Sequence, residues 1–220
     1  FFWDAYFVTL WRAALAATLA SLIAFPASFA LAFRTSETVR RWAVFFLIVP
    51  FFTSYLVRIY AWQVLLAGNG PLNTLLGYAG FGPYGMLNSS FGVMVGYMTL
   101  VLPLVVILQT FSLAAIDRSL IEAARNLGAR PRDTLLRVII PSARIGLIIG
   151  FVFAFILTFG DFVSPFYLGG SNPPTLSILI VDTTKSGQQW PRAAVVAVMM
   201  IVTLFIAASV AVAAAYRRKG

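Results

Sequence analysis

The chain has 220 residues, of which 60% are hydrophobic and 10% are charged, and its formal net charge is +9. It contains no Cys and no His, which excludes disulfides, Cys or His zinc sites, and Cys–His or Ser–His–Asp catalysis within this chain. The phosphate-binding pattern GxxxxGK[ST] is absent as well, so any ATP that is used must bind to another polypeptide. Several apolar runs reach the roughly 20 residues that a helix needs to cross a bilayer. The composition therefore predicts an all-α integral membrane protein, a polytopic helical bundle.

Five membrane spans are expected in chain order, after an aromatic interfacial belt at residues 1–5. The spans cover residues 7–33, 42–67, 91–113, 145–159 and 192–216. Prolines inside three of them can bend the helices: Pro26, Pro50 and Pro103. Between the spans, residues 72–78 are expected to form a short interfacial helix. Residues 176–181 are expected to re-enter the membrane edge.

The cations of the chain gather on one side of these spans, and the loops on that side are therefore expected to be cytoplasmic. The basic set comprises Arg34, Arg40, Arg41, Arg118, Arg125, Arg130, Arg132, Arg137, Arg144, Arg217, Arg218 and Lys219. The other side has only Arg12, Lys185 and Arg192, and Arg58 is the one clear charge within a span. This distribution places the C-terminus inside and explains the positive charge without nucleic acid. Because the N-terminus then lies outside, we expect one further span before residue 1; a genuine five-span protein is the alternative.

Residues 121–142 form a polar, basic stretch between two apolar spans. Ser119 and Glu122 have the spacing of a capping box, and Ile121, Ala124 and Leu127 fall on one apolar face. Gly128 suits a left-handed helix stop, Pro131 suits the first turn of a second helix, and Pro141 marks its exit. The sequence therefore predicts two short cytoplasmic helices joined at a sharp turn, a shape suited to a groove on a partner.

This stretch resembles the EAA loop of bacterial ABC importer permeases. The resemblance rests on Glu122-Ala123-Ala124, then Gly128, then Val138-Ile139-Ile140-Pro141, with Val138 and Ile140 departing mildly from the family pattern. It implies that residues 1–220 form a single transmembrane permease domain and that residues 114–144 are its cytoplasmic coupling loop. The residues implied to bind the ATPase subunit are Glu122, Ala123, Ala124, Arg125, Gly128 and Ala129. The alternative is an amphipathic loop of an unrelated membrane protein.

Further stretches are similar to permeases of the spermidine/putrescine type, namely residues 49–62, 70–76, 160–170 and 189–191. This resemblance implies a type I importer permease in the bacterial inner membrane, in contact with membrane lipid. The implied partners are a second permease subunit, homologous or identical, ATPase subunits that bind ATP and Mg, and a periplasmic substrate-binding protein. The chain itself would be a transport subunit without a cofactor or enzymatic activity. The implied cargo is a polyamine; an opine, a phosphonate, thiamine and ferric iron are the alternatives.

Asp161 lies at the outer end of the expected fourth span and is the candidate to meet an ammonium group of the cargo. Aromatic neighbours can add cation–π attraction. The candidate substrate path therefore comprises Asp161, Arg58, Tyr60, Trp62 and Phe162, with no metal site. Two other roles are open to Asp161: a helix-end hydrogen bond to local backbone, or an ion pair with Arg58 or Arg192.

Two other functional classes are the alternatives to an ATP-driven importer. A secondary carrier or channel driven by an ion gradient usually places ionisable residues along a relay inside the membrane. An intramembrane enzyme would need paired buried carboxylates or a nucleophile with its base. The spans contain neither arrangement. Glycine pairs at 92 and 96 and at 146 and 150 predict close helix packing instead.

Overall fold

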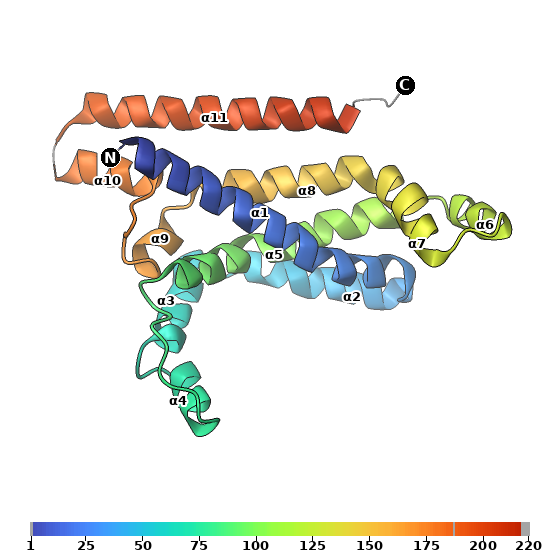
Figure 1. Ribbon diagram of the computed structural model, residues 1–220, viewed down its shortest axis with the longest axis horizontal. Coiled ribbons are helices and arrows are strands. Elements are labelled where there is room, and N and C mark those ends of the chain that lie inside the picture. The colour runs from blue at the N-terminus through green and yellow to red at the C-terminus, as the bar shows by residue number, and fades with distance from the viewer. Residues whose placement is uncertain (1, 187, 217–220) are drawn as a thin grey trace.

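The computed structural model describes residues 2–186 and 188–216, and the regular structure in this part of the chain is entirely helical. Four helices are long and apolar enough to cross a membrane: α1 (Phe2–Phe33), α5 (Ser90–Ala114), the helix that ends with α8 (Ile140–Gly160), and α11 (Trp190–Tyr216). Figure 1 shows these helices lying lengthwise along one another. Phe1 of the expected belt and Arg217, Arg218 and Lys219 of the basic set lie outside the described residues.

Small side chains allow α1 to pack closely against α5 and α8 in the centre of the bundle. Ala13, Ala17, Ala20 and Ala24 of α1 are fully buried in one cluster with valines of α5. Polar side chains then tie backbones together across the helices, since Ser28 donates to the Val106 carbonyl at 3.1 Å and Gln109 donates to the Ser21 carbonyl at 3.1 Å. In an apolar solvent such packing and interhelical hydrogen bonds replace the hydrophobic effect as the force that joins helices.

The expected second span at 42–67 is not one straight helix but is broken near Pro50, one of the prolines expected to bend the spans. The chain forms α2 (Glu37–Ile48), a short 3-10 helix (Val49–Phe52) and α3 (Tyr55–Leu66). The axes on the two sides of the break differ by 90°. Pro50 has no N–H for the helical ladder, and the hydroxyl of Thr53 donates to the Pro50 carbonyl at 2.8 Å to end the turn. Within the described residues the number of candidate spans is thus four, or five if this bent pair counts as one.

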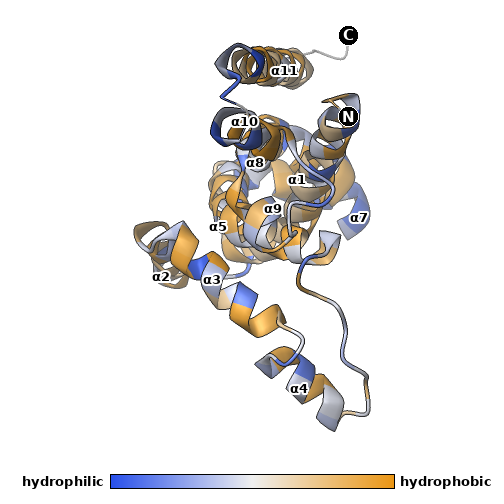
Figure 2. Ribbon diagram, turned by 90° about the vertical axis from the view of Figure 1, so that its left-hand side faces the viewer, coloured by the Kyte–Doolittle hydropathy of each residue, from blue (hydrophilic) through white to orange (hydrophobic). Residues whose placement is uncertain are grey.

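The helix α4 (Pro71–Tyr78) confirms the short helix expected near residues 72–78. Figure 2 shows that α3 and α4 project sideways from the end of the bundle at which α9 (Val163–Tyr167) and α10 (Leu176–Lys185) also lie. The segments between the long helices at this end of the bundle therefore include several short helices. Within α10, Leu176, Ser177 and Ile178 are buried, so its first turn packs into the bundle.

At the opposite end of the bundle, the stretch after α5 forms α6 (Arg118–Asn126) and α7 (Pro131–Thr134). A π-helical turn at Leu135–Ile139 then leads directly into α8, so that one bent helix runs from Pro131 to Gly160. The expected helix exit at Pro141 is therefore wrong, and the apolar stretch expected to span the membrane at residues 145–159 lies within this longer helix. Pro141 stands in the first turn of α8, where the wider π turn before it leaves space for the proline ring.

Arg12, which the sequence analysis placed among the few cations of the other side, is a buried charge within the membrane helix α1. It lies on α1 with 7% of its surface exposed. Its guanidinium donates to the Pro173 carbonyl at 3.3 Å and to the Ser90 hydroxyl at 3.2 Å. A buried cation needs such partners, and here they join α1 to the start of α5 and to the segment before α10.

Candidate functional site

The elbow, by which we mean residues 117–139, begins with an N-cap two residues earlier than the sequence suggested. The cap is Asp117, whose side chain accepts a hydrogen bond from the Ser119 backbone N–H at 2.9 Å, so the expected cap at Ser119 is wrong. That N–H lowers the pKa of Asp117 below its ordinary value, because the hydrogen bond favours the charged carboxylate. A negative charge at the N-terminus of α6 also complements the helix dipole.

The turn between α6 and α7 is a left-handed helix stop at Gly128, as the sequence predicted. Gly128 has φ +79°. Its N–H bonds to the Arg125 carbonyl at 2.9 Å, and the N–H of Ala129 bonds to the Ala124 carbonyl at 3.0 Å. These are the two hydrogen bonds of a Schellman motif, and they fix the angle at which α6 meets α7.

The six residues expected to bind an ATPase subunit lie together on α6 and its turn, at the tip of the molecule (Figure 1). Glu122, Ala123, Arg125 and Gly128 are exposed, whereas Ala124 and Ala129 are half-buried. Ile121 is the anchor of α6, since it is buried in a cluster with Leu113, Ile116 and Ile139. The elbow is thus held on the bundle by one side and presents its opposite side to solvent or a partner.

Leu127 is a residue of this surface that the sequence analysis misplaced. It was expected to share one apolar face with Ile121, yet Ile121 is buried and Leu127 is 88% exposed. The reason is that Leu127 caps the helix and no longer follows its periodicity. An apolar side chain this exposed, on the turn that carries Gly128, is a natural contact for a groove on a partner.

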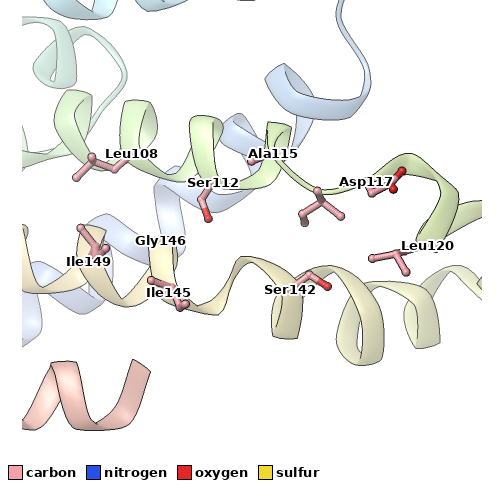
Figure 3. Close-up of a pocket in the computed structure, with 10 residues that line it drawn as sticks. Leu108, Ser112, Ala115, Asp117, Leu120, Ser142, Ile145, Gly146 and Ile149 are labelled. Atoms are coloured by element: carbon pink, nitrogen blue, oxygen red, sulfur yellow. The ribbon is translucent and has the colours of Figure 1, made fainter. Parts of the chain in front are cut away.

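A cavity of about 520 Å³ lies between the C-terminal part of α5 and the N-terminal part of α8 and reaches the elbow. Figure 3 shows Leu108 and Ser112 on one side, Ile145 and Ile149 on the other, and Asp117 and Leu120 at the elbow end. Gly146 allows this close approach, because a Cβ there would collide with the side chain of Ser112. The two helices that line the cavity, α5 and α8, both lead directly into the elbow.

The second site lies at the other end of the bundle, around Asp161, which is 8% exposed. Its carboxylate accepts hydrogen bonds from the Tyr55 hydroxyl at 2.8 Å, the Val163 N–H at 2.9 Å and the Ser164 N–H at 3.3 Å. The helix-end role is therefore realised: Asp161 satisfies free amides at the start of α9. Its observed partners are a phenol and two amides rather than Arg58 or Arg192.

The other path candidates gather around the same place, although they differ in exposure. Arg58 donates to the Thr99 carbonyl at 3.2 Å and lies over the Tyr55 ring, 5.5 Å from its centroid. Trp62 of α3 is half-buried and packs in the cluster of Ile59, Leu66 and Leu168.

Tyr60 and Phe162 are the two ends of a row of aromatic rings, which we call the aromatic row. Tyr60 meets Tyr167 at 5.1 Å, Tyr167 meets Phe166 at 4.9 Å, and Phe166 stacks on Phe162 at 5.0 Å. Tyr60 is 47% exposed and Phe166 is 43% exposed, so ring faces are accessible along the row. Such faces attract cations and also pack against alkyl chains.

Two residues of this Asp161 site were missed by the sequence analysis. Tyr55 and Ser164 both contact Asp161, and their hydroxyl oxygens are 2.5 Å apart. Tyr55 lies within the stretch that resembles the spermidine/putrescine type, but that resemblance does not say what its side chain touches. Only the fold brings α3 and α9 together, across more than 100 residues of chain.

Comparisons with known proteins identify the family of the chain and proteins of the same fold. The family described as "Binding-protein-dependent transport system inner membrane component" matches residues 6–219. The spermidine/putrescine transport system permease protein PotB of Escherichia coli K12 is 31% identical over 194 residues, which cover 87% of this chain and 70% of that protein.

Two solved structures have the same fold. A bacterial alginate ABC transporter, crystallised with an alginate-bound periplasmic protein, aligns over 94% of this chain and 75% of its own, with a TM-score of 0.73 and 15% identity. An amino acid ABC transporter crystallised with histidines aligns over 99% of this chain and 94% of its own, with a TM-score of 0.63 and 19% identity. At these identities the likeness shows a shared architecture, that of an ABC transporter permease.

Proposed function

The chain belongs to the family of inner membrane components of binding-protein-dependent transport systems, and on this premise we propose that it carries polyamines such as spermidine and putrescine. It is a multi-pass transport subunit of an ABC importer and is not itself an enzyme. The polyamine assignment is supported by the 31% identity to PotB over most of the chain. It also fits an outer site in which aromatic faces adjoin a carboxylate.

The elbow is proposed to be the contact with an ATP-binding subunit. The observation that carries this proposal is the exposed tip of α6, where Glu122, Arg125 and Gly128 stand outside the membrane bundle. Because the elbow continues into α8 without a loop, a push on α6 or α7 moves a membrane helix directly. ATP and Mg would bind to that partner subunit, since this chain lacks the GxxxxGK[ST] pattern.

The remaining partners follow from the same proposal. A second permease subunit, identical or homologous, would complete the passage, and a periplasmic binding protein would deliver the cargo at the end that holds Asp161. ATP binding would draw the ATPase subunits together and open the passage outward, and hydrolysis would reset it inward. Such coupling requires that each ligand bind one of the two states more tightly than the other.

The test has two parts. Affinity purification of this chain in mild detergent should recover an ATP-binding subunit and a second permease. Proteoliposomes that contain the purified complex, with the binding protein and labelled spermidine added outside, should then take up spermidine only when ATP is enclosed in the vesicle lumen. A chain that transports alone, without an ATPase, would overturn the importer mechanism. Uptake of 2-aminoethylphosphonate, thiamine or ferric iron in place of spermidine would overturn the assignment of polyamines as the cargo.

A further inference from the structure

Three helices meet in a polar cluster at the outer end of the bundle, and one hydroxyl lies at its centre. Tyr55 is the first residue of α3, directly after the 90° break in the second span. Its hydroxyl reaches Asp161 at 2.8 Å and Ser164 at 2.5 Å, both at the start of α9. Ser164 is itself fully buried and packs against Gly96 of α5, where a Cβ would come within 2.5 Å of the Ser164 hydroxyl.

The direction of these hydrogen bonds follows from the number of protons. A phenol has one O–H, and the Asp161 carboxylate can only accept. Tyr55 therefore donates to Asp161, and the Ser164 hydroxyl donates to the Tyr55 oxygen. Both protons point along one chain toward the carboxylate, and hydrogen bonds arranged in this way strengthen one another.

The break before Tyr55 makes this connection important for α3. Because helix α2 ends at Ile48 and the chain turns by 90°, the backbone ladder of α2 does not fix the direction of α3. Arg58 donates to the Thr99 carbonyl at 3.2 Å, which joins α3 to α5 and not to α9. Between α3 and α9, Gln63 donates to the Tyr167 carbonyl at 3.4 Å, a long bond between neutral groups. The Tyr55 hydroxyl joins α3 to the start of α9 through a charged partner, and such hydrogen bonds are the stronger class.

We propose that Tyr55 is a positioning residue of the cargo path. Its hydroxyl fixes α3 to α9, holds the Asp161 carboxylate in one orientation, and keeps Tyr60 of α3 in contact with Tyr167 of α9 so that the aromatic row is continuous. This inference rests on the proposed polyamine path for its functional consequence, but its structural content, the tie between α3 and α9, does not depend on the cargo.

The test uses Tyr55→Phe, which removes one oxygen and keeps the ring under Arg58. The complete importer in nanodiscs should show faster amide hydrogen exchange in residues 161–168 and unchanged exchange in the centres of α1 and α5. Spermidine uptake per ATP hydrolysed should fall about tenfold, as expected for loss of one hydrogen bond to a charged group. Tyr78→Phe is the matched control, because Tyr78 is 87% exposed on α4, and it should behave as the wild type. Ser164→Ala should cause a smaller change in the same direction.

A double-mutant cycle with Asp161→Asn tests whether Tyr55 acts through Asp161. The double variant should be no worse than the poorer single variant, since both changes break the same hydrogen bond. Fully additive losses would overturn the positioning role, and so would unchanged exchange in residues 161–168 of Tyr55→Phe. If the wild type takes up a cargo other than spermidine, the proposed cargo fails, while the exchange measurement still decides the role of Tyr55.

Discussion

The Asp161 carboxylate shows, at the scale of a single residue, how a charge can be held inside an apolar end of a helical bundle. Three donors surround it, and two of them are amides that α9 could not otherwise satisfy. The helix-end role and the proposed role in the cargo path are therefore compatible. Donors that hold the carboxylate in one place also hold it next to the aromatic row, with Phe162 as its neighbour in the chain.

Asp161→Asn tests that charge. The substitution keeps the size of the side chain but removes the negative charge that would attract an ammonium group and that strengthens the Tyr55 hydrogen bond. Spermidine uptake should fall about tenfold or more, from a loss of roughly 1.5–3 kcal/mol for a charge-assisted hydrogen bond. The affinity of the binding protein for spermidine should stay the same, since another polypeptide supplies it. Asp182→Asn, an exposed carboxylate on α10, is the control, and uptake by Asp161→Asn at the control level would contradict the assignment.

At the scale of an element, the elbow is defined by one backbone conformation. With φ +79°, Gly128 occupies the left-handed region, and an added Cβ would meet nothing within 4 Å. The requirement for glycine is therefore conformational and not steric. The two hydrogen bonds of the Schellman motif depend on this residue, and they set the angle at which α6 leaves α7.

Gly128→Val should uncouple ATP hydrolysis from uptake while the spans still insert. A β-branched residue at positive φ costs on the order of 1–3 kcal/mol, so the turn would relax to another geometry and shift Glu122 and Arg125. The measurements are membrane level, co-purification of the ATP-binding subunit, and uptake per ATP hydrolysed. Gly128→Asn is the matched control, because Asn adopts the left-handed conformation at lower cost. Normal coupling in the Val variant would count against the elbow as the transmitting element.

The π-helical turn at Leu135–Ile139 is the joint between the elbow and the fourth membrane helix. Its characteristic bond runs from the Ile140 N–H to the Leu135 carbonyl. Pro141 follows directly, has no N–H to donate, and would clash with the Arg137 carbonyl in a regular α-helix. We attribute the π turn to this proline, and π turns inside helices are frequent at functional sites.

Pro141→Ala should allow the segment to return to regular α-helix. The elbow would then rotate relative to α8 by about 100°, the turn of one residue in a 3.6-residue period. We expect a normal or higher membrane level together with a several-fold loss of uptake per ATP hydrolysed. Pro26→Ala in α1 serves as the control, because α1 continues through Pro26 and does not lead to the elbow. Unchanged coupling in Pro141→Ala would show that the π turn has no part in transmission.

At the scale of the whole molecule, the two sites lie at opposite ends of one bundle (Figure 1). The elbow end carries most of the described arginines, and α11 runs back toward that end. The opposite end holds α9, α10 and the α3–α4 projection (Figure 2), and Asp161 lies there between α8 and α9. Cations are retained on the cytoplasmic side of a membrane, so we expect the elbow and the end of α11 to lie inside.

Single cysteines test this orientation, because the natural chain has none. Lys185→Cys should react with a membrane-impermeant maleimide in intact spheroplasts. Arg132→Cys and Tyr216→Cys, both at exposed positions, should react only in inverted membrane vesicles. The converse labelling pattern would reverse the orientation and place the elbow away from any cytoplasmic ATPase.

The sequence by itself determined the membrane class, the positions of four of the spans and the turn at Gly128. These features depend on local properties, namely the length of apolar runs, the spacing of charges and the conformational freedom of glycine. The sequence also determined the family, because the EAA pattern is a continuous stretch of chain.

Only the tertiary structure decided that the second span is broken, that Arg12 is buried, that Leu127 is exposed, and that Asp161 is bonded to Tyr55. The structure also decided that the helix continues from the elbow through Pro141, since a proline can either follow the end of a helix or stand in its first turn. Each of these depends on what lies opposite a side chain in space. Partners such as Tyr55 and Asp161 are 106 residues apart in the chain, and no local pattern records that they meet.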